Sequence, residues 1–167
     1  MSAPERASQD GRAQRLVVFR LTGREYGIQL DHVREVLRLR PLIAIPHAPP
    51  FIEGVASIRG HLVAVLDLRK SLGLPAGPPT PSSRIVVAVV NRTVVGFLVD
   101  EVVDVLELEE SMIEPTPPVV RSKMARHYVI GVGRLGDRMI GLLNAAALLA
   151  EDELAALAQA GGKGRAR

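Results

Sequence analysis

The chain has 167 residues, about the length of one ordinary domain, and 47% of them are hydrophobic. It contains no cysteine, which excludes disulfides, thiolate metal ligands and thiol nucleophiles. Part of the formal charge of +3 lies at the two ends of the chain, and aromatic residues that could stack on bases make up only 3%. Composition therefore favours a globular protein that does not bind nucleic acid.

No stretch approaches the roughly 20 uncharged apolar residues that a membrane span requires, and the start of the chain is polar. We expect a soluble, cytoplasmic protein with no direct membrane insertion. Flexible tails are expected at residues 1–14 and at residues 159–167, the second of which is basic.

Internal repetition is the most informative feature of the sequence. Residues 27–39 align without gaps on residues 96–108, and residues 54–67 align on residues 131–144. Val, Leu and Ile supply most of the apolar side chains, and β-branched residues favour strands. The chain therefore predicts two copies of one mainly β unit.

The copies extend over about residues 16–74 and 85–149, and a proline-rich linker at residues 75–82 separates them. Each copy opens with a hairpin signature, in which a polar turn joins two β-branched runs. The predicted turns are residues 22–25 and 91–92. Many short strands divided by Gly and Pro predict two similar small barrels packed together.

Helical segments are expected at three places. Residues 33–37 have apolar side chains at helical spacing behind Asp31 as an N-cap, although their β-branched content leaves a strand open. Residues 67–73 predict a capped helical turn that ends at a glycine. Residues 144–158, rich in Ala, Leu and Glu, predict a C-terminal helix.

The sequence contains few candidate catalytic or metal-binding groups. The four histidines have no metal-ligand spacing, so we expect neither a metal nor a cofactor; they are His32, His47, His61 and His127. Residues 131–136 match the G-x-G-x-x-G pattern, but a dinucleotide fingerprint must open a helix, and residues 137–143 are typical of a strand. We interpret this segment as a glycine-rich turn, and a nucleotide-binding enzyme that uses it is the alternative function.

Two features suggest contact with a partner. Arg59 aligns with Gly136, so the fold does not itself require an arginine at this turn. Such an arginine is a candidate for partner contact, and the alternative is a structural ion pair, for instance to Glu35 or Asp67. The acidic residues in the segment 100–114 alternate with aliphatic ones, which indicates a solvated face or, as a second possibility, a patch that faces a partner.

Several segments stand in an order and spacing that resemble the CheW domain, over about residues 16–149. They are V-R-E-V-L at 33–37, I-P-H-A-P-P-F-I-E-G-V at 45–55, I-R-G at 58–60, L-D-L-R at 66–69 and V-G-F-L-V-D-E-V at 95–102. The resemblance implies a domain at residues 15–158, built from two SH3-like five-stranded β-barrels with a hydrophobic interface, short helices and a C-terminal helix. The sequence departs from the family pattern where Asn, Pro and Asp are frequent, at Ser57, Ala64 and Asn144 respectively.

The same resemblance implies a non-enzymatic adaptor in bacterial chemotaxis. Its implied partners are the cytoplasmic hairpin tip of chemoreceptors, the regulatory domain of the histidine kinase CheA, and other CheW-like domains in rings. The protein would then be recruited to membrane-associated receptor arrays. By motif, the partner-binding positions fall on Val33, Glu35, Gly54, Arg59 and Gly60.

Overall fold

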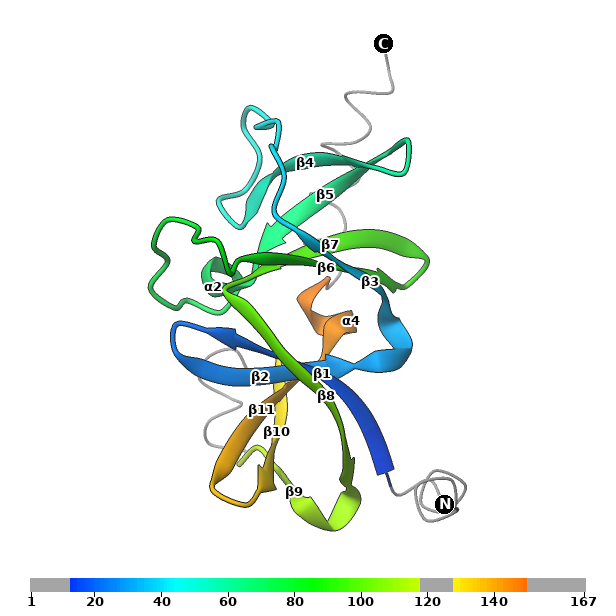
Figure 1. Ribbon diagram of the computed structural model, residues 1–167, viewed down its shortest axis with the longest axis vertical. Helices are drawn as coiled ribbons and strands as arrows, with labels where there is room; N and C mark the ends of the chain where they lie inside the picture. Colours follow the sequence, from blue (N-terminus) through cyan, green and yellow to red (C-terminus); the bar gives the residue numbers. More distant parts are fainter. Residues whose placement is uncertain (1–12, 118–127, 150–167) are drawn as a thin grey trace.

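The computed structural model describes residues 13–117 and 128–149 (Figure 1). The elements, in chain order, are β1 (Ala13–Leu21), β2 (Arg24–Gln29), η1 (Leu30–His32), β3 (Val33–Arg38), β4 (Ile52–Ile58), β5 (His61–Asp67), α2 (Leu68–Ser71), β6 (Arg84–Val90), β7 (Thr93–Val99), β8 (Glu101–Glu109), η2 (Glu110–Met112), β9 (Ile113–Pro115), β10 (Val129–Leu135), β11 (Arg138–Leu143) and α4 (Ala145–Leu148).

The strands form two sheets, and each sheet closes on itself. In the first sheet, ordered β8-β1-β2-β11-β10-β9, the strands β8 and β9 are joined by η2 and pair with opposite edges. In the second, ordered β3-β6-β7-β5-β4, the chain after β3 returns to β4, where Ile43 and Val55 exchange two backbone hydrogen bonds of 2.9 Å. We call these two closed sheets the β1 barrel and the β6 barrel.

The two barrels are interlaced along the chain. The hairpin β1–β2 of the first copy joins strands of the second copy through the parallel pairing of β2 with β11. The hairpin β6–β7 of the second copy joins strands of the first through the parallel pairing of β5 with β7. Each barrel therefore combines a hairpin from one copy with the remaining strands of the other (Figure 1).

Central strands such as β6 are buried on both faces, because one face lines its own barrel and the other meets the second barrel. Ile85 and Val87 belong to the cluster inside the β6 barrel, while Val86, Ala88 and Val90 belong to the cluster between the barrels. A strand buried on both faces needs apolar residues at every position. The unbroken I-V-V-A-V-V run of this hairpin follows from that requirement.

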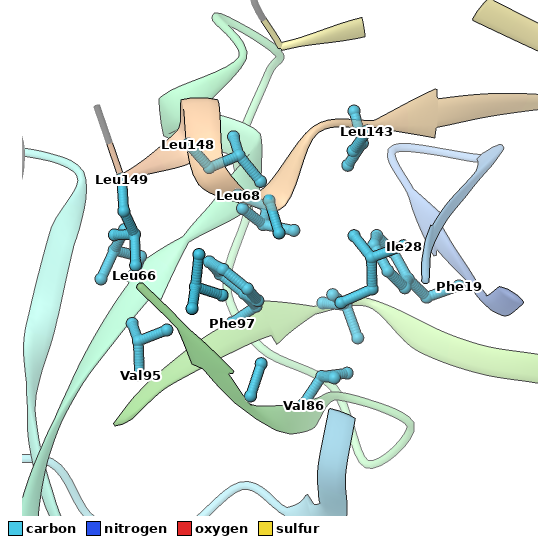
Figure 2. Close-up of a cluster of buried hydrophobic side chains, with 14 of the residues drawn as sticks. Phe19, Ile28, Leu66, Leu68, Val86, Val95, Phe97, Leu143, Leu148 and Leu149 are labelled. Atoms are coloured by element: carbon cyan, nitrogen blue, oxygen red, sulfur yellow. The ribbon is translucent and has the colours of Figure 1, made fainter. Parts of the chain in front are cut away.

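The core between the barrels receives side chains from both of them and from α4 (Figure 2). Phe19 reaches it from β1, Phe97 from β7 and Leu148 from α4, and each is at most 1% exposed. Asn144 caps α4 with its side-chain oxygen, which accepts the Ala147 N–H at 3.2 Å. Asn144 therefore acts as the N-cap of this helix.

The predicted fold class is confirmed: the chain is mainly β, with two β subdomains packed through an apolar interface. The first barrel has six strands rather than five because η2 divides one bent segment into β8 and β9. The capped turn over α2 is also observed, with Asp67 accepting the Arg69 N–H at 3.0 Å and Gly73 at φ +74° behind it.

Of the two alternatives for residues 33–37, the helix is wrong and the strand is observed, because this segment is β3 and pairs with β6. Helical structure precedes it as the short η1, and Asp31 lies inside that turn rather than at its cap. The strand alternates half-buried and exposed side chains, and this period of 2 overrides the helical spacing of its apolar residues.

The interpretation of residues 131–136 as a glycine-rich turn is also corrected, and the aligned segment of the first copy shows the same structure. Gly54 and Gly131 lie inside strands β4 and β10, and only the residue pairs 59–60 and 136–137 make the turns that follow. The first hairpin turn is likewise shorter than expected, since β2 begins at Arg24.

The boundaries of the tails and of the C-terminal helix fall partly outside the described residues. Strand β1 begins at Ala13, which pairs with Glu109, so the last two residues assigned to the first tail are part of the sheet. Of the helix expected at 144–158, the described part is α4, and residues 150–158 and 159–167 lie outside the described residues.

Residues 72–83, which include the predicted linker, contain no helix or strand. Within the described ranges no helix is long and apolar enough to cross a membrane.

A candidate docking site at the end of the β6 barrel

Glu35 projects from β3 at the end of the β6 barrel. Along this strand the exposed residues are Arg34, Val36 and Arg38, whereas Glu35 lies on the half-buried face with Val33 and Leu37. A carboxylate on that face needs a cationic partner or several hydrogen bonds, because its desolvation is costly. The side chain of Glu35 is only 17% exposed.

Arg59 supplies that partner from the β4–β5 turn. Its Nε donates to Glu35 Oε2 at 2.8 Å and its Nη2 donates to Oε1 at 2.7 Å, which is the bidentate geometry that arginine and carboxylate favour. The Arg59 side chain is nevertheless 74% exposed. One side of the guanidinium therefore holds Glu35 and the rest lies in solvent.

The turn that carries Arg59 has only two residues, both in the left-handed region. Arg59 has φ +53° and Gly60 has φ +81°, and Ile58 pairs with His61 on either side of them. Such a turn matches the twist of a hairpin, and glycine is the usual residue at its second position. An arginine at positive φ is uncommon, so this side chain is held at the barrel end by backbone geometry.

The electrostatic surroundings of Glu35 are cationic. The hydrogen bond from Arg59 holds the pKa of the Glu35 carboxyl below its usual 4.5, and the charges of Arg40 and Arg34 act in the same direction. The same contact raises the pKa of Arg59. We define the Glu35 corner by these four residues: Glu35, Arg59, Arg34 and Arg40.

Gly54 lies on the same hairpin but has a packing role. A Cβ at this position would lie 2.8 Å from the carbonyl oxygen of Ile43 and 3.0 Å from the Cβ of Leu42. The residue is buried where the chain after β3 crosses β4 to close the barrel. Gly54 therefore permits that crossing.

Val33 lies at the start of β3, where it is half-buried and packs against the core between the barrels. The structure thus brings three of the five predicted positions together at the barrel end, namely Glu35, Arg59 and Gly60. The other two predicted positions, Gly54 and Val33, are fixed by packing contacts instead. Of the two structural partners considered for Arg59, Glu35 is the one observed, because Asp67 pairs with Arg69.

The β1 barrel has an equivalent corner that sequence reasoning missed. Arg138 donates through Nη1 and Nη2 to Asp104 at 3.3 Å, and through Nε to Glu25 at 3.0 Å. Asp104 is the residue that aligns with Glu35, and Arg138 stands two positions after Gly136, the counterpart of Arg59. The repeat alignment therefore pairs the two acidic residues, Glu35 and Asp104, but it places Arg138 two positions after the counterpart of Arg59. We define the Asp104 corner as Asp104, Glu25 and Arg138.

A buried ionic cluster between the barrels was also missed. Arg69 is 6% exposed and donates to Asp67 through Nε at 3.1 Å and Nη2 at 3.0 Å, while its Nη1 donates to Asp100 at 3.0 Å. Asp100 also accepts the backbone N–H of Thr22 at 2.7 Å, from the β1–β2 turn. The cluster therefore ties α2 of one barrel to a hairpin turn of the other.

Exposed aliphatic side chains accompany both corners. Leu62, at the start of β5, is 74% exposed, and Val36 on β3 is 40% exposed. Their aligned counterparts are exposed too, with Met139 at 56% and Val105 at 55%. These side chains are candidates for contact with a partner, because exposed apolar residues that gather into a patch mark interaction sites.

The secondary structure decides between the alternatives for the glycine-rich segment at residues 131–136. The G-x-G-x-x-G segment runs through β10 into the turn before β11, so no helix N-terminus follows it. Gly131 and Gly133 are needed there for packing, since a Cβ would meet the Glu114 carbonyl oxygen and the Leu108 side chain respectively. No group of three or more potential metal ligands occurs among the described residues, and His127 lies outside them.

Fold and site define a double-barrel β protein with an arginine–glutamate pair and exposed aliphatic side chains at a barrel end. Comparison with protein-family models matches residues 15–153 to the CheW-like domain. The chain belongs to this family.

Individual relatives agree with that assignment. The probable chemotaxis protein CheW of Rhizobium etli is 37% identical over 138 residues, which cover 83% of this chain and 88% of that protein. The chemotaxis protein CheW of Klebsiella aerogenes is 34% identical over 142 residues, 85% of each chain. The protein FrzA of Myxococcus xanthus is 33% identical over 150 residues, 88% of this chain and 93% of FrzA.

A solved structure supports the fold directly. The scaffolding protein TtCheW from Thermoanaerobacter tengcongensis superposes with a TM-score of 0.77 at 31% identity, covering 84% of this chain and 94% of that one. The chain is therefore similar to a chemotaxis scaffold in sequence and in architecture.

Proposed function

We propose that this protein is a non-enzymatic adaptor that couples the cytoplasmic tips of chemoreceptors to the CheA histidine kinase. The observation that carries the proposal is the Arg59–Glu35 pair, fixed at the end of the β6 barrel with most of the arginine in solvent. Membership of the CheW-like family supports the choice of these partners. On this proposal the protein is cytoplasmic and is recruited to membrane-associated receptor arrays.

Coupling would work by docking alone. A receptor helix would pack its apolar face on exposed aliphatic residues such as Val36, while the barrel faces would bind the kinase regulatory domain and other CheW-like domains in rings. A charged rim around an apolar centre fixes the orientation of such complexes. A signal would then pass through altered packing between partners, with no covalent step on this chain.

The proposal is tested by binding. Purified chain should bind both a receptor cytoplasmic fragment and a CheA regulatory domain in isothermal titration calorimetry, and it should co-sediment with receptor-containing membranes when the kinase is present. The variant Arg59→Glu should weaken at least one of these interactions, with an unchanged circular dichroism spectrum. Failure of the unmodified chain to bind either partner would refute the proposal.

A further inference from the structure

The boundary between the two copies also divides the strands of both barrels. The first half of the chain, up to residue 71, contributes β1 to β5 and α2, and the second half, from residue 84, contributes the other elements. Among the described strands the halves pair in four places: β1 with β8, β2 with β11, β3 with β6 and β5 with β7. Each barrel is therefore an association of two halves, which residues 72–83 connect.

Side chains hold the two halves together as well. Arg69 of the first half donates to Asp100 of the second at 3.0 Å. The core between the barrels takes Phe19 from the first half and Phe97 from the second. None of these contacts involves residues 72–83, so the same contacts would form between halves of two different molecules.

The linker has to turn back on itself when both halves belong to one molecule. Asp67, at the end of β5, pairs with Leu98 of β7. Arg84, at the start of β6, pairs with Val99, the next residue of β7. The linker therefore begins and ends at the same end of the sheet, two strands apart, which is about 10 Å. Figure 1 shows the resulting loop, which leaves α2 and returns to β6.

The composition of the linker favours a straighter path. Four of the eight residues 75–82 are proline, which fixes φ and restricts the preceding residue to extended backbone. Eight residues in the polyproline conformation span about 25 Å, well beyond the separation of the two ends. The return is made by a turn in which the Ser83 N–H donates to the Thr80 carbonyl at 3.0 Å. Near its start the linker is held by the Thr22 hydroxyl, which donates to the Pro75 carbonyl at 2.9 Å.

From these observations we infer that the chain exchanges its halves with a second copy of itself, with residues 72–83 as the hinge. In the resulting dimer the first half of each molecule completes both barrels with the second half of the other, and every pairing between described strands is kept. Exchange occurs while the chain folds, because a folded molecule would first have to break four strand pairings. The dimer carries two copies of each barrel end. This inference goes beyond the proposed adaptor function and does not depend on it.

A pair of engineered cysteines reports the exchange, because the chain has none of its own. Ala13→Cys with Glu109→Cys places one thiol in each half, at directly opposed positions of β1 and β8. This disulfide forms within one chain in the monomer and between two chains in the exchanged dimer. Arg134→Cys with Met139→Cys is the matched control, since both residues pair within the hairpin β10–β11 of one half in either form.

Both proteins are refolded from urea, oxidised, and analysed by non-reducing electrophoresis and by light scattering after gel filtration. A short linker gives an effective concentration on the order of millimolar, so the interchain fraction of the reporter pair should be small and should rise roughly tenfold between about 10 and about 100 µM protein. The control pair should stay within single chains. The circular dichroism spectrum of the dimer should match that of the monomer, because the same strands pair in both.

Two linker variants test the hinge. Replacing the four prolines by serine keeps the length and should lower the interchain fraction several-fold, because a flexible linker of this length returns more readily; the prolines are Pro75, Pro78, Pro79 and Pro81. Deleting residues 75–82 should raise the interchain fraction, because the remaining linker can no longer make the same return.

Three outcomes would overturn the inference. Interchain disulfides that form equally with the reporter and control pairs would show nonspecific cross-linking. A dimer whose reporter disulfide stays within single chains would be an association of intact molecules. A reporter pair that forms no interchain disulfide, at either concentration and with any linker, would show that the halves do not exchange. If the deletion variant fails to fold, the concentration series with the unmodified linker and the serine variant still decide.

Discussion

Gly54 and Gly131 occupy equivalent positions in the two barrels, and each lies directly against a backbone carbonyl oxygen of the segment that closes its own barrel. A Cβ on Gly54 would be 2.8 Å from the oxygen of Ile43, and a Cβ on Gly131 would be 2.7 Å from the oxygen of Glu114. The repeat alignment pairs these glycines, and the structure shows why both copies need them. Gly54 is thus required by the fold whatever it contributes to binding.

We therefore expect Gly54→Ala to lower the free energy of unfolding by about 1–3 kcal/mol, because the added methyl group must displace backbone rather than a flexible side chain. Urea denaturation followed by circular dichroism measures the change. Gly77→Ala is the control, since nothing lies within 4 Å of its Cβ position, and its effect should stay within about 0.5 kcal/mol. Equal losses of stability in Gly54→Ala and Gly77→Ala would contradict the argument that a neighbouring backbone segment leaves no room for a side chain at Gly54.

Arg69 should be the most sensitive charged residue of the described chain. Arg69→Met leaves Asp67, which is 1% exposed, without its cation, and breaking a buried pair in this way costs about 3–5 kcal/mol. Thermal and urea unfolding should both show the loss. Because Arg69 also holds Asp100, the variant should loosen the contact between α2 and the β1–β2 turn, which hydrogen exchange at Thr22 would report.

The neighbouring lysine provides the matched control for that variant. Lys70 bonds Glu53 at 3.3 Å, but the two side chains are 42% and 34% exposed. An ion pair exposed to this degree contributes less than about 1 kcal/mol. Lys70→Met should therefore leave stability nearly unchanged, and a loss similar to that of Arg69→Met would show that burial does not decide the difference.

The Arg59–Glu35 pair predicts a specific dependence on pH. Since the pKa of Glu35 is lowered in the folded state, the pair stabilises the fold fully above pH 4.5, and its contribution is lost as the pH falls through the lowered value. Carboxyl NMR titration should place the Glu35 pKa below 4.5, and Arg59→Gln should raise it towards 4.5. An unchanged Glu35 titration in that variant would show that Arg59 is not the cause.

The Asn144 cap predicts a third difference in stability. Asn144→Ala removes the acceptor for the Ala147 N–H and should cost about 0.5–2 kcal/mol, whereas Asn144→Asp keeps an acceptor and should cost less. Denaturation midpoints of the two variants give the comparison. Because Leu148 of this helix is buried in the core between the barrels, a weakened cap should also lower the cooperativity of unfolding.

Much of the fold could be predicted because its signals are local. The two hairpins follow from β-branched runs around polar turns, and the α2 turn follows from Asp67 and Gly73. Segment 33–37 was misassigned because Val33, Val36 and Leu37 satisfy a helical spacing as well. Glu35 faces inward but is charged, so the sequence lacks the apolar–polar alternation of a strand at this position. Its cationic partner Arg59 lies 24 residues further along the chain.

The remaining features depend on contacts that no local pattern shows. Gly131 was interpreted as part of a turn, yet its role, like that of Gly54, is set by a neighbouring backbone carbonyl. The buried contact of Arg69 with Asp100 joins residues 31 apart in the sequence. The sequence predicted that the fold does not itself require Arg59 and offered Glu35 or Asp67 as its ion-pair partner. Only the geometry decides for Glu35 and shows that Nη1 of Arg59 has no hydrogen-bond partner among the described residues.

The exchange of hairpins between the two halves has a consequence for how the molecule is made. While the chain is being synthesised, β1 and β2 must wait for β10 and β11, which follow all strands of the β6 barrel in the chain. Two fragments cut within residues 75–82 should therefore be incomplete alone and should complement each other when mixed. The barrel that carries the Glu35 corner is complete once β6 and β7 have joined β3, β4 and β5, so this barrel can close before the β1 barrel does.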